Sequence, residues 1–218
     1  MDGSFDGILD IYHDDDVSLQ DAQNAGIIGV IHKASEGATV QDPMYPRRRH
    51  EAAGLGLLWG AYHFSSGKPP DAQAANFLNA VQWGADPTAD SSTLLCLDFE
   101  NSHSGPNMSI QDACTFVSIV HDKTGRWPLV YGSNLVQDAD KTAALTCALA
   151  NCPLWYANYN DAPQQVPHRL WTTFALWQYT DGTHGPAPRD VGTQRLDRSC
   201  FIGTQDALQQ AWPNLTSA

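Results

Sequence analysis

Short apolar segments alternate along this chain with longer segments in which apolar and polar residues are mixed. The short runs have the composition of buried β-strands, which are near-continuously hydrophobic when both faces are covered. They predict strands at residues 7–12, 27–33, 57–64, 94–100, 129–132, 154–159 and 175–179, with a last short one around 196–197. The segments between the earlier runs predict helices at residues 18–25, 43–53, 71–83 and 109–124.

Residues at both ends of the predicted helices are of types that cap or end helices. Asp71 and Ser109 stand where a side-chain oxygen can accept hydrogen bonds from the free N–H groups of a first helical turn. Gly54 and Gly125 follow the helical patterns and suit the left-handed conformation that ends many helices. These residues are therefore the predicted helix caps and stops.

The order of elements predicts the fold class. Strands that alternate with helices form parallel βαβ units, and about eight of them in a chain of this length indicate an α/β barrel of the TIM type. After Leu154 no amphipathic helix separates the strands, and Pro163, Pro167, Pro186 and Pro188 mark loops. We therefore expect an irregular TIM-like barrel with a strand-rich C-terminal part that lacks some helices, as a single domain over residues 1–218.

One predicted strand ends in two acids. The apolar run of residues 94–97 is followed by Asp98, Phe99 and Glu100. Residues i and i+2 of a strand point to the same face, about 6.6–7 Å apart along the backbone. Two carboxyl groups at that spacing suit glycoside hydrolysis, in which one donates a proton and another stabilises positive charge on the sugar. A strand that simply exits into solvent is the alternative for such a pair.

Other predicted strands also end in polar or aromatic residues. In α/β barrels the functional side chains gather at the C-terminal ends of the strands. Aromatic faces stack on sugar rings while acids and amides bind hydroxyls, so this set predicts a sugar site. Its members are Asp10, Tyr12 and His13; Lys33; Tyr62, His63 and Phe64; Asp98 and Glu100; Tyr131; Tyr156 and Asn158; Trp177, Gln178 and Tyr179; and Asp197.

Charge and hydropathy exclude several kinds of partner. The chain has 12 Lys and Arg against 24 Asp and Glu, a net charge of −12, which argues against nucleic-acid binding. The basic run of residues 47–49 falls in a predicted helix, where a solvated face is expected. No apolar stretch has the length of a membrane span, and residues 1–6 show no signal peptide. We expect a monomer with no membrane partner.

The cysteines give no sign of a metal site. There are five, an odd number, without a CxxC pair, so neither zinc nor another cofactor is expected. Cys96 lies in an apolar run and is expected in the core. Cys147 and Cys152 are close enough in sequence to close a short loop in an oxidising compartment, and reduced thiols are the alternative.

With these residues in view, the chain resembles glycoside hydrolase family 25, the Chalaropsis-type lysozymes or N-acetylmuramidases. The resemblance covers nearly the whole chain and rests on an ordered set of short motifs. They are Gly-Ile-Leu-Asp at 7–10, Gly-Val-Ile-His-Lys-Ala-Ser-Glu-Gly at 29–37, Gly-Ala-Tyr-His-Phe at 60–64, Leu-Asp-Phe-Glu at 97–100, Pro-Leu-Val-Tyr at 128–131, Leu-Trp-Tyr-Ala at 154–157, Leu-Trp-Gln-Tyr at 176–179 and Leu-Asp at 196–197.

The resemblance implies retaining cleavage of the β-1,4 bond between N-acetylmuramic acid and N-acetylglucosamine in peptidoglycan. Glu100 then matches the general acid/base, and Asp98 matches the residue that acts as nucleophile or steadies the substrate's N-acetyl group. Asp10 and Asp197 match the other site acids, with Asp6 as the alternative to Asp10. The expected substrate-binding residues are Tyr62, Phe64, Lys33, Tyr131, Tyr156, Asn158, Trp177 and Tyr179.

Two features depart from the family pattern. Leu9 stands between Ile8 and Asp10, and Arg198 and Ser199 stand where an Asn usually follows the last Asp. A catalytically silent barrel that binds wall glycan or a partner protein, or a hydrolase of another aminosugar polymer such as chitin, are the alternatives to a muramidase. Action on the cell wall implies delivery by phage lysis, by a secretion apparatus or after removal of a leader.

Overall fold

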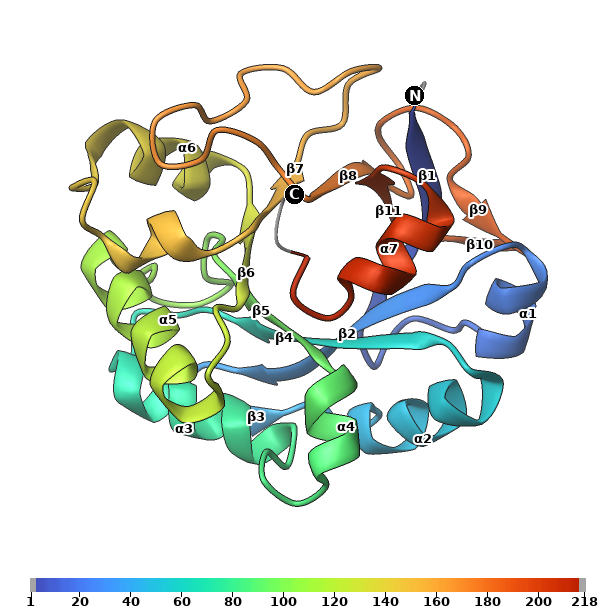
Figure 1. Cartoon of the computed structure of the whole chain (residues 1–218), viewed down its shortest axis with the longest axis horizontal. Coiled ribbons are helices and arrows are strands. Elements are labelled where there is room, and N and C mark those ends of the chain that lie inside the picture. The colour runs from blue at the N-terminus through green and yellow to red at the C-terminus, as the bar shows by residue number, and fades with distance from the viewer. Residues whose placement is uncertain (1–2, 216–218) are drawn as a thin grey trace.

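Eight strands form a closed ring in the computed structural model of the chain, which describes residues 3–215 (Figure 1). The two ends of the predicted domain, residues 1–2 and 216–218, lie outside the described residues. A ninth strand, β3 (Val40–Gln41), pairs with β2 outside the ring. The ring strands are β1 (Ser4–Ile11), β2 (Gly29–Glu36), β4 (Leu58–Phe64), β5 (Leu94–Asp98), β6 (Leu129–Gly132), β7 (Leu154–Ala157), β8 (Leu176–Asp181) and β11 (Asp197–Ile202). The predicted irregular α/β barrel is confirmed.

The direction of the strands explains the irregularity. Neighbours from β1 through β2, β4, β5, β6 and β7 to β8 run parallel, whereas β11 runs antiparallel to both β8 and β1 and closes the ring. No helix is described at residues 158–175, between β7 and β8. A hairpin of β9 (Asp190–Val191) and β10 (Gln194–Arg195) joins β8 to β11. The C-terminal part is therefore strand-rich, as its proline-marked loops predict.

Helices cover the outside of the first two thirds of the ring. They are α1 (Leu19–Asn24), α2 (Tyr45–Leu55), α3 (Pro70–Ala80), α4 (Pro87–Ser92), α5 (Ile110–Thr124) and α6 (Asn134–Thr142), followed by a short 3-10 helix (Ala148–Asn151). α4 and α6 were not among the predicted helices. α7 (Gln205–Ala211) was not predicted either. It lies across the end of the barrel where the parallel strands begin (Figure 1). There Leu208 and Leu215 pack on the inward side chains Ile8 and Leu94.

Two of the four predicted helix ends are correct. Ser109 accepts a hydrogen bond from the N–H of Asp112, and Gly125 ends α5 at φ 73°. Asp71 is not a cap: α3 begins at Pro70, whose fixed φ and missing N–H suit a first turn. Gly54 does not end α2 either, since the helix continues to Gly56, which takes the left-handed conformation at φ 70°.

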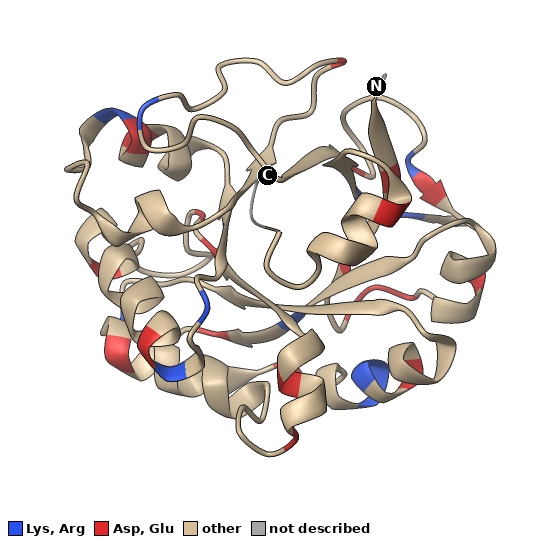
Figure 2. Ribbon diagram, viewed as in Figure 1, with Lys and Arg blue, Asp and Glu red and all other residues tan. Residues whose placement is uncertain are grey.

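The sequence predicts a solvated face for the basic run of α2, and this prediction is only partly correct. Arg48 is buried and donates hydrogen bonds to the carbonyl oxygens of Tyr12, at 2.6 Å, and Asp15. It thereby ties α2 to the loop that follows β1. The cations outside this run are spread over helices, strands and loops in Figure 2. Within residues 3–215, no helix is long and apolar enough to cross a membrane.

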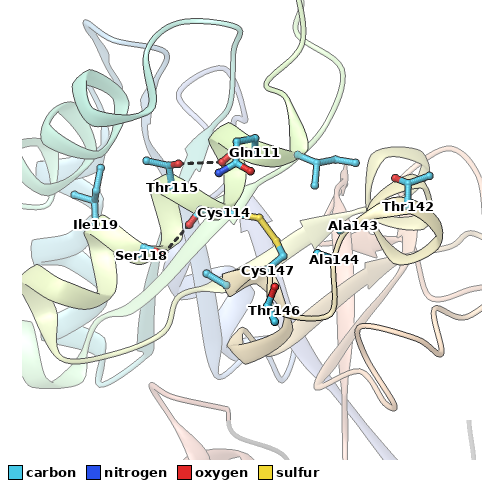
Figure 3. Close-up of a pocket in the computed structure, with 12 residues that line it drawn as sticks. Gln111, Cys114, Thr115, Ser118, Ile119, Thr142, Ala143, Ala144, Thr146 and Cys147 are labelled. Atoms are coloured by element: carbon cyan, nitrogen blue, oxygen red, sulfur yellow. Dashed lines mark hydrogen bonds between the residues drawn. A yellow bond between two sulfur atoms is a disulfide. The ribbon is translucent and has the colours of Figure 1, made fainter.

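One disulfide links α5 to the segment after α6. It joins Cys114 to Cys147, 33 residues apart, and lies in a surface hollow between these elements (Figure 3). The bridge considered between Cys147 and Cys152 is therefore wrong. Cys152 is a buried thiol, as are Cys96 and Cys200, and burial raises the pKa of Cys96 well above its usual range. The sequence did not indicate the partner of Cys147 because the contact depends on how α5 packs.

Replacing both Cys114 and Cys147 with serine should lower the free energy of unfolding by about 2–4 kcal/mol, because the unfolded chain loses a 33-residue loop constraint. Urea unfolding with and without a thiol reductant measures this loss. Reductant should destabilise the wild-type protein to the same extent and leave the double variant unchanged. A wild-type midpoint that does not respond to reductant would contradict the bridge.

Candidate active site

A cavity of about 300 Å³ opens where the ring strands end. Four carboxyl groups, one cation and several aromatic rings line it. The lining residues are Asp10, Tyr12, Lys33, Tyr62, Phe64, Asp98, Glu100, His103, Tyr131, Trp155 and Asp197. Eight of the twelve site residues that the family resemblance implies are among them, contributed by β1, β2, β4, β5, β6 and β11 and by the residues just beyond β5. The structure thus brings together acids that lie almost 190 positions apart in the sequence.

Strand alternation decides which side chains reach the cavity. Asp98 is the last residue of β5, and Glu100 follows two positions later, so both carboxyls open onto the same space. Asp10 of β1 stands opposite Asp197 of β11 in the strand register. β11 lies four strands from β5 around the ring, so Asp197 is on the opposite wall of the cavity from Asp98.

Four predicted substrate-binding residues do not line the cavity. Tyr156 belongs to the cluster between strands and helices, and its hydroxyl bonds with Gln137 and with the carbonyl of Gln164. Trp177 and Tyr179 flank an inward residue of β8 and so point outward. Asn158 lies in the loop after β7 and donates to the carbonyl of Gln164.

Of their inward neighbours, Trp155 was not predicted, whereas Gln178 was included in the predicted sugar site but was given no role. Trp155, rather than Tyr156, reaches the cavity from β7, and its ring contacts that of Tyr131 at 4.5 Å. Gln178, between Trp177 and Tyr179, bonds to Asp10 and Asp197. The signal available was the period of two along each strand, but its phase depends on register with the neighbouring strands.

Burial changes the proton affinity of the central acids. Asp98 is 7% exposed, and its Oδ1 has no hydrogen-bond partner among the described residues. Burial, and next the charge of Glu100, hold the pKa of Asp98 well above its usual range. Burial also raises the pKa of Glu100. The pair therefore retains a proton at a pH where exposed carboxyls have lost theirs.

The pKa values of the two acids on the opposite wall are also raised. Burial and then the charge of Asp197 hold the pKa of Asp10 well above its usual range. Burial raises the pKa of Asp197 to about 7, with Asp15 as the next cause. Asp6, the alternative to Asp10, lies outside the cavity lining and pairs with Arg198 at 3.0 Å. The structure therefore places Asp10 rather than Asp6 among the cavity acids.

Replacing Asp197 with asparagine should stabilise the protein more at pH 8 than at pH 4. The folded-state pKa of about 7 lies above the ordinary value of 3.8, so the folded chain holds a proton that the unfolded chain releases between those pH values. The native carboxyl therefore costs stability as pH rises through this window, and asparagine avoids the cost. The gain should differ between the two pH values by at least about 1 kcal/mol.

Chemical unfolding of both proteins at pH 4 and pH 8 measures this difference. Asp161→Asn, in an exposed loop, is the control and should show no such pH dependence. An equal effect of Asp197→Asn at both pH values would show that Asp197 titrates normally in the folded protein.

Aromatic and basic groups complete the cavity. The ring of His103 stacks on Phe64 at 4.4 Å, and the ammonium of Lys33 lies 5.0 Å from the centre of the same Phe64 ring. Lys33 also pairs with Glu36 at 2.5 Å. His63, by contrast, is fully buried behind this wall and bonds with Ser35 and Gln73, so it has a packing role.

A larger hollow lies elsewhere on the surface, around the Cys114–Cys147 disulfide, with a volume of about 690 Å³ (Figure 3). None of its twelve lining residues carries a charge. It has no group able to donate or accept a proton near neutral pH. The acid-lined cavity is therefore the candidate active site.

Comparison with known proteins identifies the family to which the chain belongs. The family model for glycosyl hydrolases family 25 matches residues 9–186, which include the cavity acids Asp10, Asp98 and Glu100. The chain belongs to glycosyl hydrolase family 25. Asp197 and the closing strand β11 follow the matched segment.

Relatives of this family 25 chain include both characterised and uncharacterised proteins. The N,O-diacetylmuramidase of Chalaropsis sp is 29% identical over 178 residues, covering 76% of this chain and 82% of the relative. The uncharacterized protein YegX of Escherichia coli is 26% identical over 183 residues, covering 81% of this chain. The chain spans 60% of the length of YegX.

The fold is similar to that of a solved muramidase. The muramidase from Acremonium alcalophilum superimposes with a TM-score of 0.76 at 28% identity, covering 96% of this chain and 99% of that chain. The agreement extends over both the parallel part of the barrel and its strand-rich closure.

Proposed function

We propose that this protein is a peptidoglycan hydrolase that cleaves the β-1,4 bond between N-acetylmuramic acid and N-acetylglucosamine. The observation that carries the proposal is that Asp98 and Glu100 open onto one cavity with raised pKa values. A carboxyl that keeps its proton toward neutral pH can donate it to the leaving glycosidic oxygen. Relatives named muramidase and N,O-diacetylmuramidase support this choice of bond.

In this proposal Glu100 is the general acid/base. It protonates the leaving oxygen and then takes a proton from the water that completes hydrolysis. Asp98 stabilises the positive charge, either by orienting the substrate's N-acetyl group for attack on the sugar or as the nucleophile itself, and both routes retain configuration. The charge of Lys33 opposes the rise in the pKa of Asp98 without reversing it.

The remaining cavity residues suit a glycan strand. Tyr62, Phe64 and Tyr131 offer aromatic surface for sugar rings, and Asp10 and Asp197 offer acceptors for hydroxyl groups. Lys33 is the single Lys or Arg among the lining residues and suits an anionic substituent. One chain supplies all these groups, which supports the proposal of a monomeric enzyme. The proposed substrate implies that the enzyme acts on the cell wall.

Clearing of purified peptidoglycan suspensions tests the proposal, with defined chitin oligosaccharides as a second substrate. We expect the turbidity of the peptidoglycan suspension to fall and the chitin oligosaccharides to be cleaved little. Sedimentation of the protein with walls that stay turbid would instead indicate a glycan-binding barrel without activity. Faster cleavage of chitin than of wall would assign the site to another aminosugar polymer.

A further inference from the structure

Gln178 lies directly behind the cavity wall and bonds to three residues that line it, Asp10, Tyr131 and Asp197. It is the inward residue at the middle of β8 and is fully buried. Its register partners are Ala157 of β7 and Ser199 of β11, so it stands where the parallel part of the barrel meets the antiparallel closing strand. A buried amide at such a point must satisfy its donors and its acceptor with protein groups.

Two tyrosine hydroxyls bind the oxygen of this amide. Tyr131 of β6 donates to Gln178 Oε1 at 2.6 Å, and Tyr159, just beyond β7, donates to the same oxygen at 2.7 Å. Burial raises the pKa of both phenols above the ordinary value, so both keep the proton that they donate. Both acceptor positions of the amide oxygen are therefore used.

The nitrogen of the amide binds two carboxyl groups. Gln178 Nε2 lies 3.1 and 3.0 Å from the two carboxyl oxygens of Asp10 and 3.3 Å from Oδ2 of Asp197. These acids come from adjacent strands; the charge of Asp197 raises the pKa of Asp10, whereas a hydrogen bond from Asp10 lowers the pKa of Asp197. An amide nitrogen carries two protons and no charge, so it can hold two neighbouring carboxyls without itself titrating.

The orientation of the amide follows from these contacts. In the reverse orientation its carbonyl oxygen would face the oxygens of two carboxyl groups, and the two phenols would accept hydrogen bonds instead of donating them. The carboxyl groups therefore select the orientation that directs N–H groups at them, and the two tyrosines support it by donating to the amide oxygen. Networks of this kind, with every member satisfied, restrict their side chains to one arrangement.

We propose that Gln178 is a positioning residue for the reaction, an amide clamp fixed by Tyr131 and Tyr159 that holds Asp10 and Asp197 side by side. The clamp presents both acids to the substrate on the wall opposite Asp98. It rests on the proposed glycan hydrolysis for its effect on turnover, while the clamp itself is a property of the resting protein. Small displacements of substrate-positioning groups lower rates steeply, by up to about 100-fold for 1 Å.

Kinetics on soluble peptidoglycan fragments test the effect on turnover. Gln178→Met, which keeps the length of the side chain but removes its hydrogen bonds, should lower kcat/KM by about 10- to 100-fold. Tyr159→Phe, which removes one hydroxyl from a half-buried ring, should give a smaller loss in the same direction. Tyr45→Phe, which removes a buried hydroxyl that accepts a hydrogen bond from Trp59 on the far side of β4, is the matched control and should keep wild-type kinetics.

NMR titration of the aspartate carboxyl carbons tests the clamp without any substrate. The Gln178 hydrogen bond lowers the pKa of Asp10, so the pKa of Asp10 should rise in Gln178→Met and in Tyr159→Phe and stay the same in Tyr45→Phe. Because Tyr159→Phe removes a single oxygen, it serves as the second test if Gln178→Met does not fold.

The two measurements separate the clamp from the proposed function. Wild-type kinetics in folded Gln178→Met or Tyr159→Phe, with the wild-type protein active, would overturn the positioning role. A wild-type protein that cleaves no peptidoglycan would overturn the proposed function, and the titration of Asp10 would still decide whether the clamp exists. An unchanged Asp10 titration in the folded variants would overturn the clamp.

Discussion

Glu100→Gln should fold normally and lose about 10²- to 10⁴-fold in turnover on peptidoglycan, the usual contribution of a general acid. Glutamine keeps the shape of the side chain but has no carboxyl proton to donate to the leaving oxygen. In the wild-type protein burial raises the pKa of Glu100, so the proton is held toward neutral pH. The variant should therefore show this loss at every pH, not merely a shifted pH optimum.

Release of soluble fragments from purified peptidoglycan between pH 4 and pH 9 measures this loss, with circular dichroism to confirm folding. Glu51→Gln, on α2 outside the cavity lining, is the matched control and should keep wild-type turnover. A folded Glu100→Gln that digests peptidoglycan at the wild-type rate would remove Glu100 from the mechanism.

Asp98→Asn should reduce kcat by about 100-fold or more while KM changes little. The substitution removes a negative charge that is needed when positive charge develops on the sugar, an interaction made mainly in the transition state. The carboxyl is nearly fully buried and one of its oxygens has no described hydrogen-bond partner, so its burial is not explained by a structural network.

A comparison with Asp90→Asn separates chemistry from folding. Asp90 is a buried carboxyl outside the cavity that accepts a hydrogen bond from Gly84, so its loss should lower stability and leave kcat unchanged. If Asp98→Asn behaved like Asp90→Asn, the role of Asp98 would be structural. Mass spectrometry of quenched wild-type reactions adds a further distinction, because a glycosyl adduct on Asp98 would identify it as the nucleophile.

The barrel could be predicted from sequence because each strand is a short apolar run bounded by polar residues. The end of β5 could be predicted too, since Asp98 and Glu100 share a face by the simple period of a strand. The short helix α4 was missed because its polar sequence carries no clear amphipathic pattern. α6 does carry one, with Val136, Ala139 and Asp140 buried at helical spacing, and was overlooked. The Cys114–Cys147 bridge depends on helix packing that sequence spacing does not report.

The site was predicted less completely where two aromatic residues stand together or flank a polar one. In β7 the sequence offers both Trp155 and Tyr156, and only the register with Tyr131 of β6 decides that Trp155 faces inward. In β8 the inward residue is Gln178, between two larger aromatic residues that attract attention first. Tyr159 lies beyond β7, where strand alternation no longer applies.

The identity of the new reducing ends tests the central claim most directly. Peptidoglycan digested by the wild-type protein is reduced with borohydride and hydrolysed, and the resulting amino-sugar alcohols are separated. The proposed bond specificity predicts muramitol in proportion to the fragments released, and none above background with Glu100→Gln. Glucosaminitol as the product, or no new reducing ends from a protein that binds the walls, would contradict the account.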